Sequence, residues 1–227
     1  MTDPLDEPLH RQSAAELVSD RLMQLIVAGV LKAGEPLRET QLAERLGISR
    51  NSLREGIRLL ERSRLVKYEM HRGAIVSDPS LADLEDLYRT RRHIETAAVQ
   101  VTPTAEGLER LRVAWARLEA SASISSAEPI VAADLALHQA IVALLGSERI
   151  SAFYATICKE LVFYFSVLSH ADEEYRNPQA PIVDRHREIV EAILERRVEE
   201  AERLTLQHID ENEHRLADIL RARADAA

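Results

Sequence analysis

Apolar residues recur at helical spacing in three stretches near the start of the chain. The pattern predicts helices over residues 13–28, 39–46 and 50–61. Gly47 follows the second stretch, at the position where a left-handed residue commonly ends a helix. Ser49 then supplies a favourable N-cap for the third helix. Two helices separated by a tight turn are therefore predicted, which is the layout of a helix-turn-helix.

A β-hairpin is predicted directly after these helices. Residues 65–68 and 74–76 are rich in β-prone side chains, and the tip between them is Met70-His71-Arg72-Gly73. A helix-turn-helix followed by such a hairpin predicts a winged helix-turn-helix, with three helices and a β-hairpin wing. We place this domain at residues 10–77.

The remainder of the chain has helical spacing almost throughout, with short breaks at prolines, glycines and polar runs. Ser80 and Asp83 form the pattern of a capping box at the start of the first helix. Six helices are predicted, over residues 80–101, 104–121, 129–145, 148–170, 179–197 and 199–222. Short connections favour antiparallel neighbours. The predicted fold class is therefore mainly α, a winged helix-turn-helix followed by an all-α antiparallel bundle of six to seven helices at residues 80–222.

The distribution of charge matters more here than the net charge of −9. Residues 10–76 contain 12 Lys and Arg against 8 Asp and Glu, whereas residues 77–227 contain 17 against 27. A bound polyanion responds to the field within about a Debye length, roughly 8–10 Å. A locally basic first domain is therefore compatible with a nucleic-acid partner, although the whole chain is acidic.

Composition also limits the classes of protein to which the chain can belong. No apolar run approaches the roughly 20 residues of a membrane span. The first ten residues are acidic and contain Pro4 and Pro8, unlike a signal peptide. Cys158 is the only cysteine, which excludes an internal disulfide and a four-cysteine zinc site. We therefore predict a cytoplasmic protein with no membrane partner.

The third predicted helix carries residue types that read DNA bases. Arg50, Asn51 and Arg54 lie in its first turn and a half, the part of a recognition helix that enters the major groove. There, Arg can bind guanine O6 and N7 in a bidentate way, and Asn can bind adenine likewise. Ser49 and the free N–H groups at the helix start suit phosphate oxygens.

The alternative interpretation of this helix is a solvated charged face. Arg54 would then pair with Glu55, and Arg58 with Glu61, on the surface of one helix. Either pair alone would account for its arginine without DNA. The order of tight turn, capped basic helix and basic-tipped hairpin favours DNA binding for the block as a whole.

The first domain closely resembles the winged-helix domain of the GntR family. The resemblance covers about residues 13–77 and is carried by the run LAERLGISR…LRE…LLE…LV…RGA. It implies a double-stranded DNA partner that faces Arg38, Ser49, Arg50, Asn51, Arg54, His71, Arg72 and Gly73. There are departures: Asn51-Ser52-Leu53 replaces a common Thr-Pro-Val, and Gly56 replaces a common Ala. A mid-helix Gly costs about 0.5–1 kcal/mol relative to Ala.

Four side chains of the predicted bundle form a candidate metal site. Asp134 and His138 are four residues apart, so they meet on one face of a helix whose apolar neighbours point it inward. His186 lies on another inward face, and His208 lies on the last helix. An Asp and three neutral imidazoles suit a divalent metal, with Zn²⁺ favoured and Ni²⁺ or Mn²⁺ also admitted. The alternative is that each histidine is simply a hydrogen-bonded residue of the core or its rim.

The second block resembles the all-helical effector domain, FCD, of the FadR-type branch of GntR regulators. The resemblance covers about residues 80–220. It rests on three short motifs: Asp134-Leu-Ala-Leu-His138, His186-Arg-Glu-Ile and His208-Ile. Many members with these four residues bind a metal and place a small carboxylate effector beside it, so the resemblance implies both ligands. Arg91 and Glu95 match positions that line the same cavity, although a surface ion pair between them is the alternative.

The two resemblances together imply a transcription regulator rather than an enzyme. One winged helix covers too little DNA for strong discrimination, so we expect a homodimer on a palindromic operator. A small carboxylate in the bundle would modulate this binding. Two other functions stay open, a metal sensor without an organic effector and a metal-dependent hydrolase fused to a DNA-binding module. The lack of an HExxH motif argues against the hydrolase.

Overall fold

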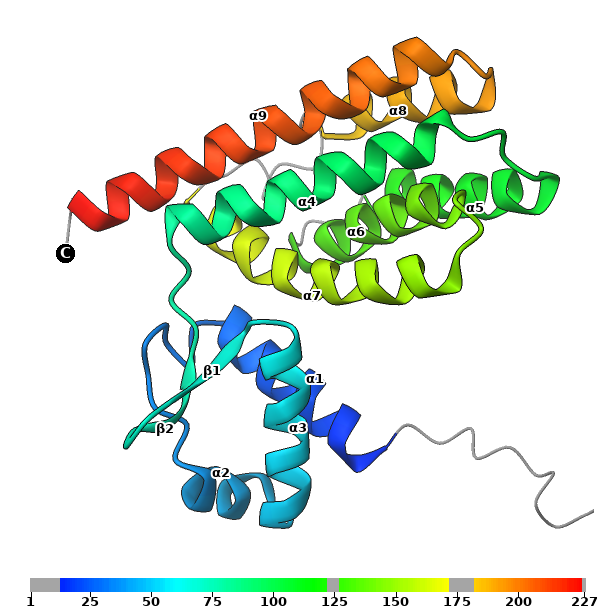
Figure 1. Ribbon diagram of the computed structural model, residues 1–227. Helices are drawn as coiled ribbons and strands as arrows, with labels where there is room; N and C mark the ends of the chain where they lie inside the picture. Colours follow the sequence, from blue (N-terminus) through cyan, green and yellow to red (C-terminus); the bar gives the residue numbers. More distant parts are fainter. Residues whose placement is uncertain (1–12, 122–126, 172–181, 226–227) are drawn as a thin grey trace, which may run out of the picture. The chain divides into compact units, whose positions relative to one another are not determined.

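The computed structural model describes most of the chain, namely residues 13–121, 127–171 and 182–225 (Figure 1). The chain divides into two compact units, Met1–Asp78 and Pro79–Ala227. Helices dominate both units, and the two described strands lie in the first. The predicted domain start at residue 10 and the predicted helix start at residue 179 lie outside the described residues.

The N-terminal unit is a winged helix-turn-helix, as the sequence predicts. Side chains cap its helices, because Ser13 shares a reciprocal capping box with Glu16 and Ser49 accepts a hydrogen bond from the backbone N–H of Ser52. Gly47 ends the second helix in the left-handed region, with φ of 66°. The elements are α1 (Ala14–Val27), α2 (Glu39–Leu46), α3 (Arg50–Arg62), β1 (Val66–Glu69) and β2 (Gly73–Val76).

Gly56 lies at a close contact of α3 with α1. A Cβ atom at this position would lie 2.6 Å from Cγ1 of Val18 and 3.1 Å from the carbonyl oxygen of Ala15. Leu22 of α1 and Leu53 of α3 are fully buried in the same unit. The missing side chain of Gly56 therefore has a packing cause, which offsets its poor helix propensity.

The hairpin covers one side of this small core and carries the wing tip. β1 and β2 are antiparallel, with Val66 opposite Val76 and Glu69 opposite Gly73. Every residue of β2 after Gly73 is buried, whereas the middle of β1 is exposed. The hairpin is thus anchored by one strand, and its tip at residues 70–72 extends beyond the paired residues.

The C-terminal unit is an all-α bundle, which confirms the predicted fold class. Ser80 and Asp83 form the predicted capping box, and Gly146, with φ of 66°, separates two helices at an expected break. Its helices are α4 (Leu81–Gln100), α5 (Ala105–Ser121), α6 (Ala127–Ala143), α7 (Glu148–Ala171), α8 (Ile182–Leu194) and α9 (Val198–Asp225). Among the described residues, none of the helices is both long enough and apolar enough for a membrane span.

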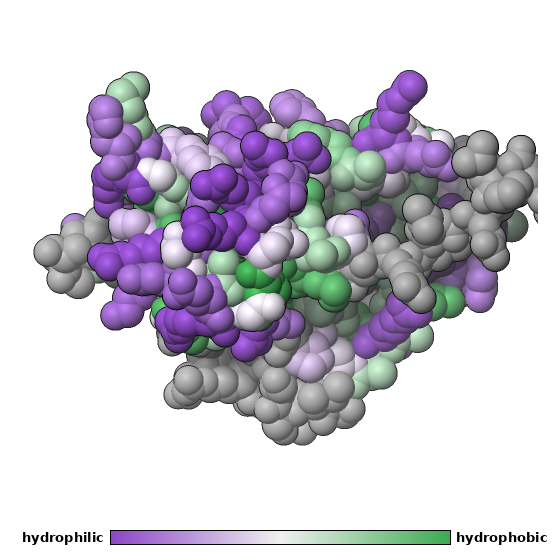
Figure 2. Space-filling view, turned by 90° about the horizontal axis from the view of Figure 1, so that it is seen from below, coloured by the Kyte–Doolittle hydropathy of each residue, from purple (hydrophilic) through white to green (hydrophobic). Residues whose placement is uncertain are grey.

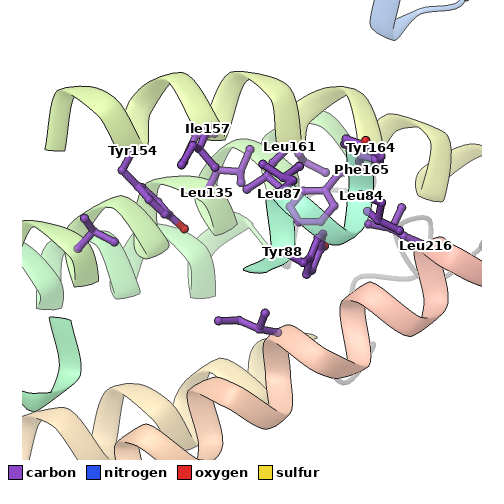
Figure 3. Packing of buried hydrophobic residues seen from close by; sticks show 14 of the residues in the cluster. Leu84, Leu87, Tyr88, Leu135, Tyr154, Ile157, Leu161, Tyr164, Phe165 and Leu216 are labelled. Carbon is purple, nitrogen blue, oxygen red and sulfur yellow. The ribbon is translucent and has the colours of Figure 1, made fainter. Parts of the chain in front are cut away.

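The bundle core contains tyrosines as well as aliphatic side chains. α4 packs along α9, and α6 packs against both α5 and α7. Leu84 from α4, Leu161 from α7 and Leu216 from α9 are fully buried in one cluster, together with Tyr88 and Tyr154 (Figure 3). Buried tyrosine hydroxyls need polar partners. Buried charged and polar side chains lie in the same bundle, and the hydroxyl of Tyr154 donates to one of them, Glu95.

Candidate DNA-contact surface and metal centre

The residues predicted to contact DNA all lie in the N-terminal unit, and all are exposed. Arg38 is the N-cap residue of α2, and Ser49 is the N-cap residue of α3. The hydroxyl of Ser49 accepts from the backbone of Ser52 and lies 2.8 Å from the Ser52 hydroxyl. The full set is Arg38, Ser49, Arg50, Asn51, Arg54, His71, Arg72 and Gly73.

The ion pairs of α3 differ from those expected for an isolated charged helix. Arg54 donates from Nε to Oε2 of Glu39 on α2 at 2.6 Å, rather than pairing with Glu55. Arg58 donates to Glu55 at 2.6 Å, rather than pairing with Glu61. The hydrogen bond and the charge of Glu39 raise the pKa of Arg54 above its ordinary value. Arg54 is thus oriented by another helix, while its side chain remains 60% exposed.

The wing tip is the second exposed feature of this unit. His71 and Gly73 have φ of 65° and 76°, so the chain turns tightly between the strands. Arg72 donates to Glu69 at 2.6 Å, and Met70 is 84% exposed. Because His71, Arg72 and Gly73 are exposed, the tip presents an imidazole, a guanidinium and accessible backbone. More generally, much of the described surface is hydrophilic when seen from below in Figure 2, with smaller hydrophobic areas.

The four predicted metal ligands come together in the bundle core. Asp134 and His138 project from α6, His186 from α8 and His208 from α9. All four are between 0% and 6% exposed. The three imidazole centroids lie 4.4–5.3 Å apart, and one potential ligand atom from each histidine lies within 4.8 Å of the others. The histidines thus form one cluster, rather than three separate core residues.

The distances within this cluster fit a shared metal ion. Nε2 of His138 and Nε2 of His186 are 3.2 Å apart, and Oδ1 of Asp134 lies 2.8 Å from the latter. Metal bonds of about 2.0–2.2 Å hold neighbouring ligand atoms about 2.8–3.5 Å apart. Although close to His186, this oxygen has no well-aligned hydrogen bond among the described residues. A donor atom that shares a metal with its neighbour has this geometry.

The protonation states of the cluster also suit a metal. Burial lowers the pKa of His208 well below its ordinary value, which keeps that imidazole neutral. Burial by itself would raise the pKa of Asp134, but neighbouring groups, the nearby imidazoles and the charge of Arg91 among them, hold it below its ordinary value. A neutral imidazole and an ionised carboxylate are the forms that bind a divalent metal.

Glu95 orients His138 from outside the cluster. Nδ1 of His138 lies 2.7 Å from Oε2 of Glu95, and an ionised carboxylate requires this nitrogen to donate. Burial would raise the pKa of Glu95, but the charge of Arg91 and the interaction with His138 hold it well below its usual range. Because Nδ1 carries the proton, the lone pair of Nε2 faces the cluster. Carboxylates commonly orient metal-binding histidines in this way.

Arg91 and Glu95 form a buried ion pair beside the cluster, not the surface pair considered as an alternative. Nε of Arg91 donates to Oε1 of Glu95 at 2.7 Å, and both side chains are 0% exposed. Tyr154 donates to the same oxygen at 2.5 Å. Neither Nη atom of Arg91 has a hydrogen-bond partner among the described residues, and the same holds for the hydroxyl of Tyr88. The site therefore presents unused donors in the core.

Tyr88 and Tyr154 are residues of this site that the sequence pattern does not indicate. Burial raises the pKa of Tyr88 to about 12, so its hydroxyl remains a neutral donor. The guanidinium carbon of Arg91 lies 5.1 Å from the centroid of the Tyr88 ring. A spacing of three residues on one helix is the only sequence signal for this neighbour. Tyr154 comes from α7, so no local pattern links it to Glu95.

Comparisons with known proteins agree for both units. The family model described as bacterial regulatory proteins, gntR family, matches residues 14–76, and the FCD domain model matches residues 86–211. The uncharacterized HTH-type transcriptional regulator YdhC of Bacillus subtilis is 24% identical, over 88% of this chain and 90% of that protein. The Glc operon transcriptional activator of Escherichia coli K12 is 27% identical, over 92% and 91%.

Solved structures show the same architecture. A GntR transcriptional regulator from Rhodococcus sp. RHA1 has a TM-score of 0.75 at 26% identity and covers 90% of this chain and 98% of its own. Escherichia coli McbR/YncC shares the fold, with a TM-score of 0.73 at 19% identity over 92% and 99% of the two chains. The FCD match alone spans more than half of the sequence. The chain therefore belongs to the GntR family of bacterial transcription regulators, with an N-terminal DNA-binding winged helix and a C-terminal FCD domain.

Proposed function

We propose that this protein is a cytoplasmic homodimeric regulator whose operator binding is controlled by a small carboxylic acid held near a divalent metal in the bundle. One observation carries the proposal. Arg91 is fully buried, yet both of its Nη atoms lack a partner among the described residues. A buried cation with unpaired donors is costly unless an acceptor completes it.

The metal would be held by Asp134, His138, His186 and His208. Three imidazoles and one carboxylate favour Zn²⁺, and they also admit Ni²⁺ or Mn²⁺. When bound, the ion supplies a positive charge that attracts an anionic ligand. Glu95 keeps His138 in the tautomer that exposes Nε2. The metal also has a structural effect, because it joins α6, α8 and α9 at one point.

Arg91 supports a carboxylate as the organic ligand. Its two Nη atoms match the spacing of the two oxygens of a carboxylate, which a guanidinium binds in a bidentate way. The hydroxyl of Tyr88 adds a neutral donor beside it. Because the side chains of this site are buried, a ligand here is small and reaches it only when the surrounding helices separate locally.

The proposal is tested with full-length protein, added Zn²⁺ and a panel of acetate, lactate, pyruvate, succinate and citrate. Trp115 is the single tryptophan and lies in α5, so its fluorescence follows unfolding of the bundle. We expect at least one acid to raise the unfolding temperature and to change the affinity for operator DNA. The same acid should have no effect on Arg91→Lys, which loses the planar fork.

Arg89→Lys is the matched control for this experiment, because Arg89 lies on the same helix with a 65% exposed side chain. This variant should respond to the acid like the wild type. A protein whose DNA binding depends on the metal but on none of the acids would contradict the effector proposal. That result would favour the metal-sensor function instead.

Base reading is assigned to Arg50 and Arg54 within this proposal. Both are exposed in the first turn and a half of α3. Asn51 would read a base as well, whereas Arg38 and the wing tip would contact phosphates or the minor groove. The Ser49 hydroxyl accepts the capping hydrogen bond from the backbone of Ser52. Phosphate binding at this end of α3 would therefore depend on the other backbone N–H groups of the first turn. Two-fold dimers place two such helices on palindromic half-sites.

Arg54→Ala is expected to weaken binding to the operator by about 5- to 150-fold and to relax base preference at one position of each half-site. The reason is the loss of a bidentate contact to a guanine edge. Fluorescence anisotropy with operator variants at fixed salt measures both effects. Arg58→Ala is the control, because Arg58 lies one turn further along and pairs within its own helix. Equal losses of affinity for operator and random duplexes would refute base reading by Arg54.

A further inference from the structure

Glu39 connects the two helices of the helix-turn-helix through the side chain of Arg54. It is the first residue of α2, and its Oε2 atom accepts from Arg54 Nε at 2.6 Å. The Glu39 side chain is 22% exposed and that of Arg54 is 60% exposed, so the carboxylate is the more enclosed partner. The two residues are 15 positions apart, which makes the contact a product of the domain fold.

This hydrogen bond occupies one edge of the guanidinium group. Arginine presents Nε and two Nη atoms in a rigid planar fork. No other hydrogen bond of Arg54 is described among the placed residues, so its Nη atoms remain available. We infer that Glu39 is a positioning residue, which holds Arg54 so that its two Nη atoms meet a guanine edge end-on. The inference rests on the proposed base-reading role of Arg54.

Two physical effects make such a contact a determinant of sequence specificity. First, an arginine that is oriented before binding loses less rotamer freedom on the DNA, which is worth a factor of about two to ten in affinity. Second, the carboxylate of Glu39 repels phosphates whenever Arg54 leaves it. Sequences that draw Arg54 away are therefore penalised, while the sequence that accepts the held orientation is not.

A merely structural role for Glu39 has different consequences. A carboxylate in the first turn of a helix stabilises that helix through its dipole. Loss of this effect would lower the stability of the N-terminal unit without changing the preference among DNA sequences. Stability and specificity can therefore be measured separately to distinguish the two roles.

The experiment uses the full-length protein and two duplexes. Wild-type protein first enriches a duplex from a random library, and a scrambled duplex of the same composition serves as the reference. The readout is the ratio of the two affinities at one salt concentration. We expect Glu39→Gln, which keeps the side-chain size, to lower this ratio about three- to tenfold. In the Arg54→Ala background, Glu39→Gln should lower it no further, because the two residues act as one unit.

Glu55→Gln is the matched control, because Glu55 accepts from Arg58 at 2.6 Å within the same domain. Both substitutions remove one negative charge, so both variants should gain affinity for DNA of any sequence. Only Glu39→Gln should lower the affinity ratio, whereas Glu55→Gln should keep the wild-type ratio. A ratio that falls no more in Glu39→Gln than in Glu55→Gln overturns the positioning role. If Arg54→Ala itself leaves the ratio unchanged, the base-reading proposal fails, and the positioning role fails with it.

Discussion

Arg91→Met is expected to destabilise the C-terminal unit by about 3–5 kcal/mol, because it removes one partner of a fully buried ion pair and leaves the charge of Glu95 uncompensated. Methionine keeps much of the side-chain volume, so the loss reports mainly on charge. Urea unfolding of the full-length protein, followed by the fluorescence of Trp115, measures the effect in the bundle alone.

Arg92→Met provides the control on the same helix. Arg92 is 29% exposed and pairs with Asp210 and Glu213 near the surface, so its replacement should cost about 1 kcal/mol or less. Adding Glu95→Gln to Arg91→Met should recover part of the lost stability, because no unpaired buried charge then remains. Equal losses for the two arginine variants would contradict the central role assigned to the buried pair.

Removal of the metal is expected to lower the unfolding temperature of the bundle by about 5–10 °C. An ion that binds only the folded state contributes about 2.7 kcal/mol at a hundredfold excess over its dissociation constant, and each kcal/mol corresponds to about 2–4 °C at this size. Thermal unfolding of protein purified without a polyhistidine tag is recorded with and without EDTA. His138→Ala should unfold at the same temperature in both conditions, because it lacks one ligand.

His214→Ala is the control for this experiment, because His214 is exposed on α9 and has no place in the cluster. It should respond to EDTA like the wild type. The metal effect should shrink only in acid below the ordinary pKa of histidine, because the imidazole of His208 must be neutral to bind the metal and burial lowers its pKa. Burial lowers the pKa of His208, so protons bind the unfolded state more strongly, and acid opposes the folded state in the same direction. Less than one metal equivalent by elemental analysis, with no EDTA effect, would contradict the metal site. Asp134, His138, His186 and His208 would then be ordinary polar residues of the core.

Local patterns in the sequence determined the elements of both units. The Ser49 N-cap and the capping box of Ser80 and Asp83 were predicted, because such signals depend on residues at most four positions apart. Helix ends were less well determined. The helix predicted over 129–145 is Ala127–Ala143, and the one predicted over 199–222 is Val198–Asp225. Terminal turns depend on capping contacts and packing as well as on apolar spacing.

The residues of the candidate metal centre could be selected from the sequence, but their arrangement could not. Helical spacing placed Asp134 and His138 on one face. The convergence of His186 and His208 on that face depends on how α8 and α9 pack. The contacts of Glu95 with His138 and with Tyr154 also escaped local reasoning, since these two residues lie on helices other than that of Glu95. Side chains far apart in sequence meet only through the packing of helices.

Sequence alone therefore determined the helix-turn-helix, the wing, the helical bundle and the residue types available for DNA and metal binding. The tertiary structure decided which partner each charged side chain has. Arg54 pairs with Glu39 rather than Glu55, and Arg91 is buried rather than exposed. It also explains why residue 56 is a glycine, because α1 lies too close to leave room for a side chain there. Apolar periodicity shows which face of a helix is buried, but only the packing of a second helix on that face fixes the contacts and the electrostatic environment of its polar residues.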